Sequence, residues 1–265
     1  MRLALAQTGA LARRAIVDTL RTPQALFPSL FFPLVLMAIF TGSFGNAPGV
    51  LPGFPDVRGF LDFALAGAVL QGILIGGTSA GSAFALDIEG GFFDRLVASP
   101  VSRTAILAGR LLGGVTLAMA QTVLFVAVGL AFGARIEGGA VGVASLLLIA
   151  ALLATAVSGL GIILALRTGS AEAVQGTFPL FFALMFFSSA FFPRETMTGW
   201  FRWVADANPV SYLVEGMRDQ IIEADPGRAT LLGLAVAVAV AAISIGFCHP
   251  PFRSRLAGDA GRRCA

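Results

Sequence analysis

Six long runs without a charged residue divide the chain, and short charged islands separate them. The runs cover residues 22–55, 63–86, 111–134, 138–166, 173–193 and 229–252. Each can hold the ~20 apolar residues that cross a hydrocarbon core about 30 Å thick. The pattern predicts an all-α polytopic membrane protein, one domain over residues 1–265, with transmembrane helices within Leu26–Phe44, Phe63–Leu86, Leu111–Phe132, Val141–Leu164, Val174–Phe192 and Ala229–Phe247.

Composition supports a membrane chain over a soluble one. The chain is 57% hydrophobic and 12% charged, whereas an ordinary soluble domain has about 25% charged residues. All 18 basic residues are arginine, so the lysine of the phosphate-binding motif G-x-x-x-x-G-K-[ST] is absent. If this protein uses ATP, another polypeptide must therefore hydrolyse it. The net charge of +3 is too small to indicate nucleic-acid binding.

Arginine counts predict the orientation, because cytoplasmic loops carry the excess of basic residues. With both termini in the cytoplasm, 12 arginines lie inside and 6 outside. The loop over residues 194–228 is the exception, since its four arginines would then lie outside. The count includes Arg58 in the loop between the first two expected spans and four arginines in the tail: Arg253, Arg255, Arg262 and Arg263.

Residues 2–21 have the periodicity of an amphipathic helix that ends before Pro23. Arg14, Asp18 and Arg21 share one face, with Arg13 beside them, and small apolar residues occupy another face. Such a helix lies at the cytoplasmic headgroup boundary. The alternative is a solvated leader.

The loop over residues 87–110 also contains a helical pattern. Apolar positions from Ile88 to Val97 recur at helical spacing, opposite charged ones. They predict a short amphipathic helix that ends at Pro100, after which Ser102 caps the next helix. The apolar positions are Ile88, Phe92, Phe93, Leu96 and Val97, and the charged ones are Asp87, Glu89, Asp94 and Arg95. An ordinary interfacial helix without a partner explains the periodicity equally well.

The loop over residues 194–228 is too patterned for a simple linker. One apolar stripe contains Trp200, a second follows Asn208-Pro209, and both have helical spacing. We expect two short helices that rest on or dip into the outer leaflet. Trp200, Trp203 and Tyr212 would anchor them at the membrane interface.

The interiors of the expected spans contain no Asp, Glu, Lys or Arg, which argues against an ion-coupled transporter. Gly72/Gly76 and Gly77/Gly81 have the small-xxx-small spacing of closely packed helices. The polar positions either line a substrate path or form hydrogen bonds between helices. They are Gln71, Thr78, Ser82, Gln175, Thr177, Ser188 and Ser189.

An intramembrane serine protease of the rhomboid type is the enzyme alternative. Ser158 lies in the fourth expected span and His249 ends the sixth. This match is thin, because His249 is followed by Pro250-Pro251 and sits at the membrane edge.

The run from Asp87 to Arg103, with Leu107-Ala-Gly109-Arg110 after it, resembles the cytoplasmic signature of ABC type-2 permeases, most closely the daunorubicin-resistance group. Further matches lie at both ends of the chain. They are Arg21-Thr-Pro23, Pro193, Asn208-Pro209-Val210-Ser211-Tyr212 and Glu215-Gly216-Met217-Arg218.

This resemblance implies a permease subunit that works as a homo- or heterodimer in the bacterial plasma membrane and docks a separate ABC ATPase. That partner would hold the ATP and Mg²⁺, and this chain would hold no cofactor. Residues 87–99 would form the coupling helix, the helix over residues 2–21 would flank it, and residues 194–223 would form the outer gate. The residues implied for ATPase coupling are Asp87, Glu89, Phe92, Phe93, Asp94, Arg95, Leu96, Pro100 and Arg103. The cargo would be a hydrophobic or amphipathic drug or antibiotic, or alternatively a lipid or glycan.

Overall fold

The computed structural model describes residues 2–46, 48, 50, 54–55, 57 and 59–262, without the side chains of Arg2, Ala25 and residues 249–262. Arg58, Arg263 and the side chains of His249, Arg253, Arg255 and Arg262 thus lie outside the described residues. The elements are α1 (Arg2–Leu20), α2 (Pro23–Phe44), α3 (Phe60–Glu89), α4 (Phe92–Ala98), α5 (Arg103–Ala131), α6 (Gly139–Thr168), α7 (Ala171–Gln175), α8 (Phe178–Phe186), the 3₁₀ turn η1 (Arg194–Thr196), α9 (Gly199–Ala207), α10 (Pro209–Ile222) and α11 (Arg228–Arg262).

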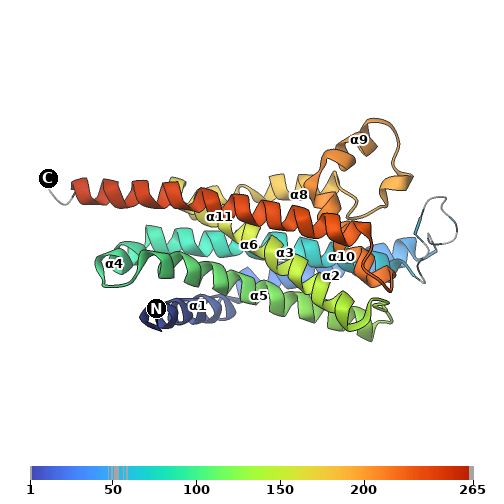
Figure 1. Cartoon of the computed structure of the whole chain (residues 1–265), viewed down its shortest axis with the longest axis horizontal. Helices are drawn as coiled ribbons and strands as arrows, with labels where there is room; N and C mark the ends of the chain where they lie inside the picture. Colours follow the sequence, from blue (N-terminus) through green and yellow to red (C-terminus); the bar gives the residue numbers. More distant parts are fainter. Residues whose placement is uncertain are drawn as a thin grey trace.

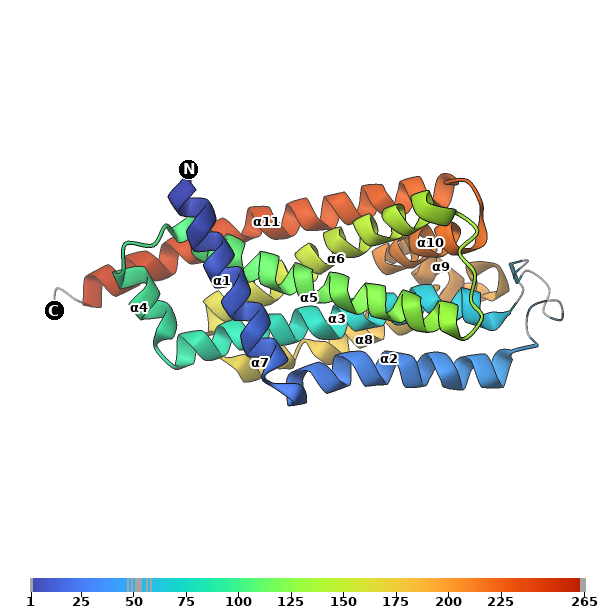
Figure 2. The ribbon, with the colours of Figure 1, turned by 90° about the horizontal axis from the view of Figure 1, so that it is seen from below.

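The long helices α2, α3, α5, α6 and α11 run side by side along the longest axis (Figure 1). At one end, α1 crosses the bundle at a steep angle instead of running along it (Figure 2). The short helix α4 and the last turns of α11 lie at this same end, which we call the α4 end. The opposite end, where α9 projects from the bundle, is called the α9 end.

Within the described residues, five helices are long and apolar enough to cross a membrane: α2, α3, α5, α6 and α11. The expected all-α membrane fold is confirmed. The helix expected over Val174–Phe192 is instead divided into α7 and α8, and α8 ends at Phe186. Pro179 in the first turn of α8 has no amide hydrogen to continue the ladder of α7, and Gly176 just before it favours the break.

Helix α3 forms the centre of the bundle and packs against α2, α5 and α6. Small residues allow this: a Cβ built on Gly81 would lie 2.7 Å from the Cα of Gly161 on α6. Gly77 contacts α6 in the same way, through Val157. The packing role predicted for the small residues is therefore confirmed, and both glycine pairs are used within one chain.

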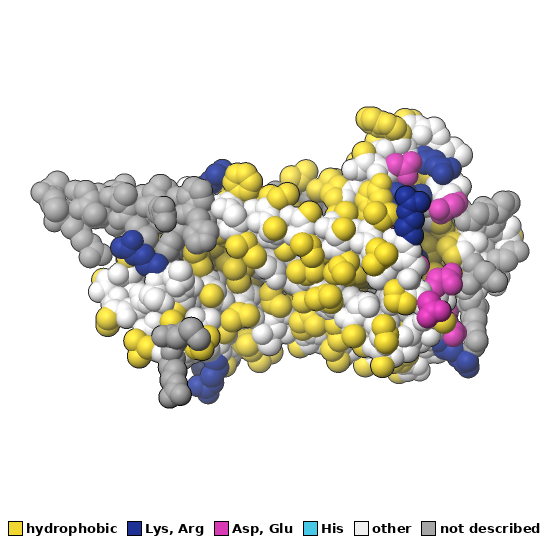
Figure 3. Space-filling model, in the orientation of Figure 1, with side chains coloured by type: hydrophobic (Ala, Val, Ile, Leu, Met, Phe, Trp, Pro, Cys, Tyr) yellow, Lys and Arg dark blue, Asp and Glu magenta, His cyan; other side chains and the backbone are white. Residues whose placement is uncertain are grey.

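Apolar side chains cover the middle of the described surface, while charged side chains gather toward its two ends (Figure 3). Phe27, Phe31 and Ile39 of α2 are more than half exposed. A soluble protein rarely exposes so large a contiguous apolar area. The surface therefore suits a hydrocarbon environment, with the α4 and α9 ends at the two membrane faces.

Candidate functional site

The α4 end contains a sharp corner between α3 and α4. Helix α3 continues to Glu89, and Gly91 then takes a left-handed conformation (φ 67°) that a residue with a side chain rarely adopts. The expected helix over residues 87–99 is therefore too long: it begins at Phe92, and Asp87 and Glu89 belong to α3.

Helix α4 is held by one face and exposed on the other. Phe93 is 2% exposed and meets the ring of Phe84 edge to face, with 5.6 Å between the ring centroids. Asp94 and Arg95 are exposed, and Leu96 is partly buried. The amphipathic character predicted for this segment is confirmed for Phe92–Ala98. Its exposed charged side can meet another protein.

Asp87 is the centre of a charge cluster just below this corner. Arg14 of α1 approaches Asp87 at 3.2 Å, and Arg110 of α5 forms a second ion pair with it. The Asp87 side chain is only 16% exposed. The helical pattern predicts Asp87 on the charged, partner-facing side, but in the structure Asp87 lies inside the protein, where two arginines compensate its burial.

Two further contacts fasten α1 to the same corner. The guanidinium of Arg14 lies 3.5 Å from the centroid of the Phe92 ring. The Gln7 amide donates to the carbonyl of Pro100 at 3.2 Å and accepts from the amide of Ser102 at 3.1 Å. Helix α1 is thus joined to α3, α4 and the start of α5.

The remaining charged residues described on or directly after α1 are Arg13, Asp18 and Arg21. Arg13 and Arg21 are exposed. Asp18 pairs with Arg14 at 3.3 Å across one helical turn. The predicted capping of α5 by Ser102 is confirmed, since its hydroxyl accepts from the amide of Ala105 at 3.3 Å. Arg103, the first residue of α5, is exposed.

A cavity of about 650 Å³ opens between the α1–α2 junction, α3 and α7. Three of the seven polar positions predicted for a substrate path line it: Thr78, Ser82 and Gln175. Thr78 and Ser82 donate to carbonyls of their own helix, at 2.8 and 3.2 Å. Ile75 and Phe178 add apolar wall. The cavity can accept a molecule with both polar and apolar parts.

The remaining four polar positions do not reach this cavity. Gln71 is 2% exposed, and its Nε2 has no hydrogen-bond partner among the described residues. It borders a small space of about 20 Å³ beside Met37 and Phe191. The Thr177 hydroxyl donates to Val174 at 2.6 Å, and Ser188 and Ser189 are buried at the α9 end. The structure therefore brings three of the seven predicted path residues together at one cavity and leaves the other four elsewhere.

Asn208 and Arg218 hold the chain where α8 ends. The side-chain amide of Asn208 donates to the carbonyls of Leu184 and Phe187, at 2.6 and 3.0 Å, while its oxygen accepts from Val210 and caps α10. Arg218 is 4% exposed, and its guanidinium donates to the carbonyl of Phe63 on α3 and to the carbonyls of Ser189 and Ala190 in this turn. These bonds replace the helical ones that end at Phe186.

Helix α10 packs between α3, α6 and α11 instead of resting on the outer leaflet. Its side chains from Val210 to Ile221 are largely buried, and Pro209 begins the helix at a position where no amide hydrogen is needed. The expected position on the leaflet surface is therefore wrong for α10, because an apolar stripe has the same spacing whether protein or lipid covers it.

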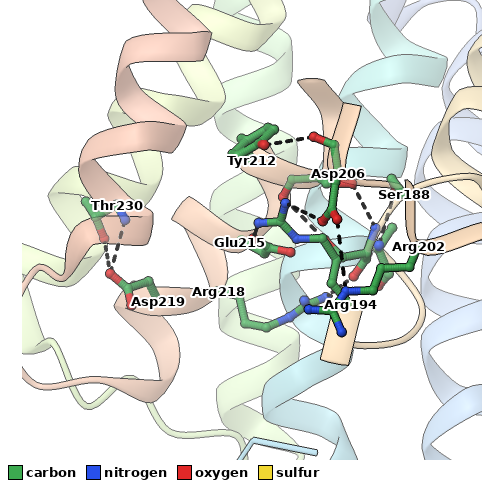
Figure 4. A network of polar contacts seen from close by, with 12 residues as sticks. Ser188, Arg194, Arg202, Asp206, Tyr212, Glu215, Arg218, Asp219 and Thr230 are labelled. Atoms are coloured by element: carbon green, nitrogen blue, oxygen red, sulfur yellow. Dashed lines mark hydrogen bonds and ion pairs between the residues drawn. The ribbon is translucent and has the colours of Figure 1, made fainter. Parts of the chain in front are cut away.

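Arg194 organises the polar cluster at the α9 end (Figure 4). It pairs with Glu215 and, at 3.3 Å, with Asp206, and its guanidinium lies 4.7 Å from the ring centroid of Tyr212. The Tyr212 hydroxyl donates to the Asp206 carbonyl at 2.8 Å. Burial acts to lower the pKa of Arg194, but the hydrogen bond and charge of Glu215 outweigh it and raise that pKa, so the side chain stays cationic.

Trp200 and Trp203 lie on the outer side of α9, 69% and 73% exposed. Pro193 is buried and precedes the turn that leads to α9. The exposure of the two tryptophans agrees with the expected anchoring role, which stays a prediction.

Arg110, Gln7 and Arg194 organise these contacts, although the sequence pattern does not predict that role for them. Arg110 had a signal, because it is a charged residue in the first turns of an otherwise apolar span. Gln7 and Arg194 had none, because their partners are distant along the chain. Ser158, the serine of the protease alternative, is 1% exposed and faces Gly114 of α5, so no substrate reaches it in this conformation.

Residues 6–222 match the family described as "ABC-2 type transporter". Over 211 residues the chain is 33% identical to "Daunorubicin resistance ABC transporter permease protein DrrB1" of Streptomyces coeruleorubidus, covering 78% of this chain and 71% of that protein. It is 26% identical to "Putative transport permease ycf38" of Porphyra purpurea, with 79% and 72% covered. It is 23% identical to "Probable doxorubicin resistance ABC transporter permease protein DrrC" of Mycobacterium tuberculosis, with 82% and 77% covered.

These matches confirm the resemblance carried by the residues around Asp87 and Asn208. They cover most of the chain, including the α3–α4 corner, the cavity and the turn after α8. The chain therefore belongs to the ABC-2 type transporter family.

Proposed function

We propose that this permease is the membrane subunit of an ATP-driven exporter and that a separate ABC ATPase docks on α4. The observation that carries the proposal is the two-sided placement of α4. Phe93 fixes it to the bundle, while Asp94 and Arg95 remain exposed. The absence of lysine from the chain supports an ATPase in another polypeptide, which would also hold the ATP and Mg²⁺.

The contacts around Asp87 give this docking a mechanical consequence. A displacement of α4 acts on α3 through Phe93 and on α1 through the contact of Arg14 with Phe92. Asp87 joins both helices to α5 through Arg110. ATP binding in the partner then shifts the bundle between inward and outward states, because the nucleotide stabilises one of them more than the other.

The working unit would contain a second copy of this chain or a paralogue. The exposed apolar faces of α2 and α8, on either side of the cavity, supply a surface for it. We place the assembly in a bacterial plasma membrane with the α4 end and both termini in the cytoplasm. The excess of arginine in the segments at that end supports this orientation.

The cargo would be a hydrophobic or amphipathic compound such as a drug or antibiotic. Ile75 and Phe178 line the cavity together with the hydroxyls of Thr78 and Ser82, which suits a molecule of mixed character. The names of two relatives refer to resistance to daunorubicin and doxorubicin. Lipid or glycan cargo is the alternative for the same machinery.

Affinity purification of the tagged full-length chain from native membranes tests the docking. An ABC ATPase should co-purify with the wild type, and Asp94→Arg should reduce its recovery at least tenfold. Asp225→Arg is the matched control, because Asp225 is an exposed aspartate at the α9 end. Equal recovery with the Asp94 variant would show that the ATPase does not dock on α4.

Inside-out vesicles that contain the purified complex test the cargo. ATP-dependent accumulation of daunorubicin, followed by its fluorescence, is the expected result. Accumulation of a fluorescent short-chain phospholipid but not of daunorubicin would favour lipid cargo instead. Transport of either compound without the ATPase would contradict the proposed energy source.

A further inference from the structure

The two halves of the interrupted fifth span belong to different parts of the bundle. Ala171 and Val174 of α7 are buried in the apolar cluster at the α4 end, which also contains Phe84 and Phe93. Met185 of α8 belongs to the central cluster instead. Helix α7 is therefore packed with the proposed ATPase-docking corner, and α8 with the body of the bundle.

A carboxylate at the corner holds the first amide of α7. Oε1 of Glu89 accepts a hydrogen bond from the amide of Ala171 at 2.7 Å, across 82 residues of sequence. Glu89 is the last residue of α3, directly before the Gly90-Gly91 turn into α4. Apolar packing alone would let α7 slide along the cluster, whereas a charged hydrogen bond to a backbone amide is directional and fixes its position.

The interruption at Gly176–Thr177 lies at the edge of the 650 Å³ cavity. Gln175, the last residue of α7, and Phe178, the first of α8, both line it. The amide of Thr177 still donates to Val174 at 3.1 Å, and the amides of Leu180 and Phe181 then donate to Thr177 at 3.1 and 3.2 Å. A change in the angle between α7 and α8 would therefore move the side of the cavity wall that these two helices form, relative to α3 and the α1–α2 junction.

We infer that Glu89 is a positioning residue that couples a displacement of α4 to bending of the fifth span at Gly176–Thr177. Glu89 carries the motion of the corner to α7, while Asn208 and Arg218 keep the end of α8 in place. The bend changes the width of the cavity. This inference rests on the proposed docking of an ATPase at α4.

Spin labels at Ala173→Cys and Leu184→Cys, on a background with Cys248 and Cys264 replaced by serine, report the distance between α7 and α8. Distance distributions are measured by pulsed electron paramagnetic resonance in the full complex, without nucleotide and with ADP–vanadate trapped. The wild type should show a nucleotide-dependent shift. Glu89→Ala should lose most of that shift.

Two variants separate coupling from general damage. Glu89→Gln retains an oxygen that can accept from Ala171, and it should keep part of the shift. Glu172→Ala removes an exposed carboxylate from the first turn of α7 and should keep all of it. A full shift in Glu89→Ala would overturn the inference.

The hinge can be tested with Glu89 intact, which keeps the inference falsifiable even if Glu89→Ala does not fold. Gly176→Ala combined with Pro179→Ala should allow α7 and α8 to join and should abolish the shift; a persistent shift would overturn the inference. A wild-type complex that turns over ATP without any shift would overturn the inference alone. A chain to which no ATPase binds would overturn the proposed function and the inference with it.

Discussion

The guanidinium carbon of Arg218 lies 3.5 Å from the centroid of the Phe63 ring, and its Nε donates to the carbonyl of that same residue at 3.2 Å. Its Nη2 donates to the carbonyls of Ser189 and Ala190, at 3.0 and 3.1 Å. One buried side chain of α10 thus joins α3 to the turn that follows α8. The charge of Arg218 is stabilised by backbone carbonyls and by the face of an aromatic ring. Among the described residues, no carboxylate forms a hydrogen bond or ion pair with it.

Replacing Arg218 by alanine should therefore destabilise the bundle at the α9 end. The carbonyls of Phe63, Ser189 and Ala190 would lose their donors in a place that water does not reach. We expect a loss of roughly 3 kcal/mol in the free energy of unfolding, since each unpaired buried group costs about 1–3 kcal/mol. Unfolding in mixed micelles with increasing sodium dodecyl sulfate, followed by circular dichroism, measures it.

Arg218→Lys should lose less, because an ammonium keeps donors but cannot lie flat on Phe63 while it donates to three carbonyls. Arg202→Ala is the control, because Arg202 is exposed and its contact with Asp206 is 4.0 Å long. If Arg218→Ala unfolded at the same detergent fraction as the wild type, the role assigned to the buried guanidinium would be wrong.

Asp87→Asn should destabilise the α4 end, because Arg14 and Arg110 would then face each other without a negative charge between them. Breaking such a partly buried cluster from one side costs about 3 kcal/mol or more. The double variant Asp87→Asn with Arg110→Gln should recover part of this loss. The melting temperatures of the wild type, the two single variants and the double variant form a double-mutant cycle. They are followed with a thiol-reactive dye at Cys248. Additive losses in the double variant would contradict a direct pair.

The sequence predicts well what depends on local pattern. The charge-free runs locate the long helices, and Ser102 caps α5 because an N-cap involves only its next three residues. Small residues on α3 indicate close helix contacts for the same local reason. Gly176 and Pro179 flank the break before α8 and are a local signal for it. The apolar run continues through the break, however, and therefore predicts one uninterrupted span.

The rest depends on partners that are distant along the chain. Arg218 bonds a carbonyl 155 residues away, and Asp87 meets Arg14 from 73 residues away. Neither the burial of Arg218 nor the internal use of Asp87 can be derived from periodicity, because a charged residue on a helix is expected to face solvent. These two positions are where tertiary packing overrides the local pattern.

Gly81→Ala should disrupt the contact between α3 and α6. The added Cβ would lie 2.7 Å from the Cα of Gly161, and the neighbouring backbone cannot move aside as a flexible side chain can. Overpacking of this kind costs about 1–3 kcal/mol. We expect a lower melting temperature and a lower yield of monodisperse protein in size-exclusion chromatography.

Gly42→Ala on α2 is the matched control for Gly81. A Cβ there meets nothing within 4 Å, and alanine is the better helix former by about 1 kcal/mol. This variant should be as stable as the wild type or slightly more so. A larger loss in Gly42→Ala than in Gly81→Ala would contradict the packing argument.

The chain has two tryptophans, Trp200 and Trp203, and both lie on α9. Its intrinsic tryptophan fluorescence therefore reports this helix alone. If they anchor α9 at headgroup level, as aromatic side chains do at membrane interfaces, lipids brominated near the headgroup end of the acyl chain should quench the emission more strongly than lipids brominated near the chain terminus. Trp200→Phe and Trp203→Phe assign the signal to each position. Quenching by iodide in the aqueous phase, without any by brominated lipids, would instead place α9 above the membrane, because iodide does not enter the hydrocarbon core.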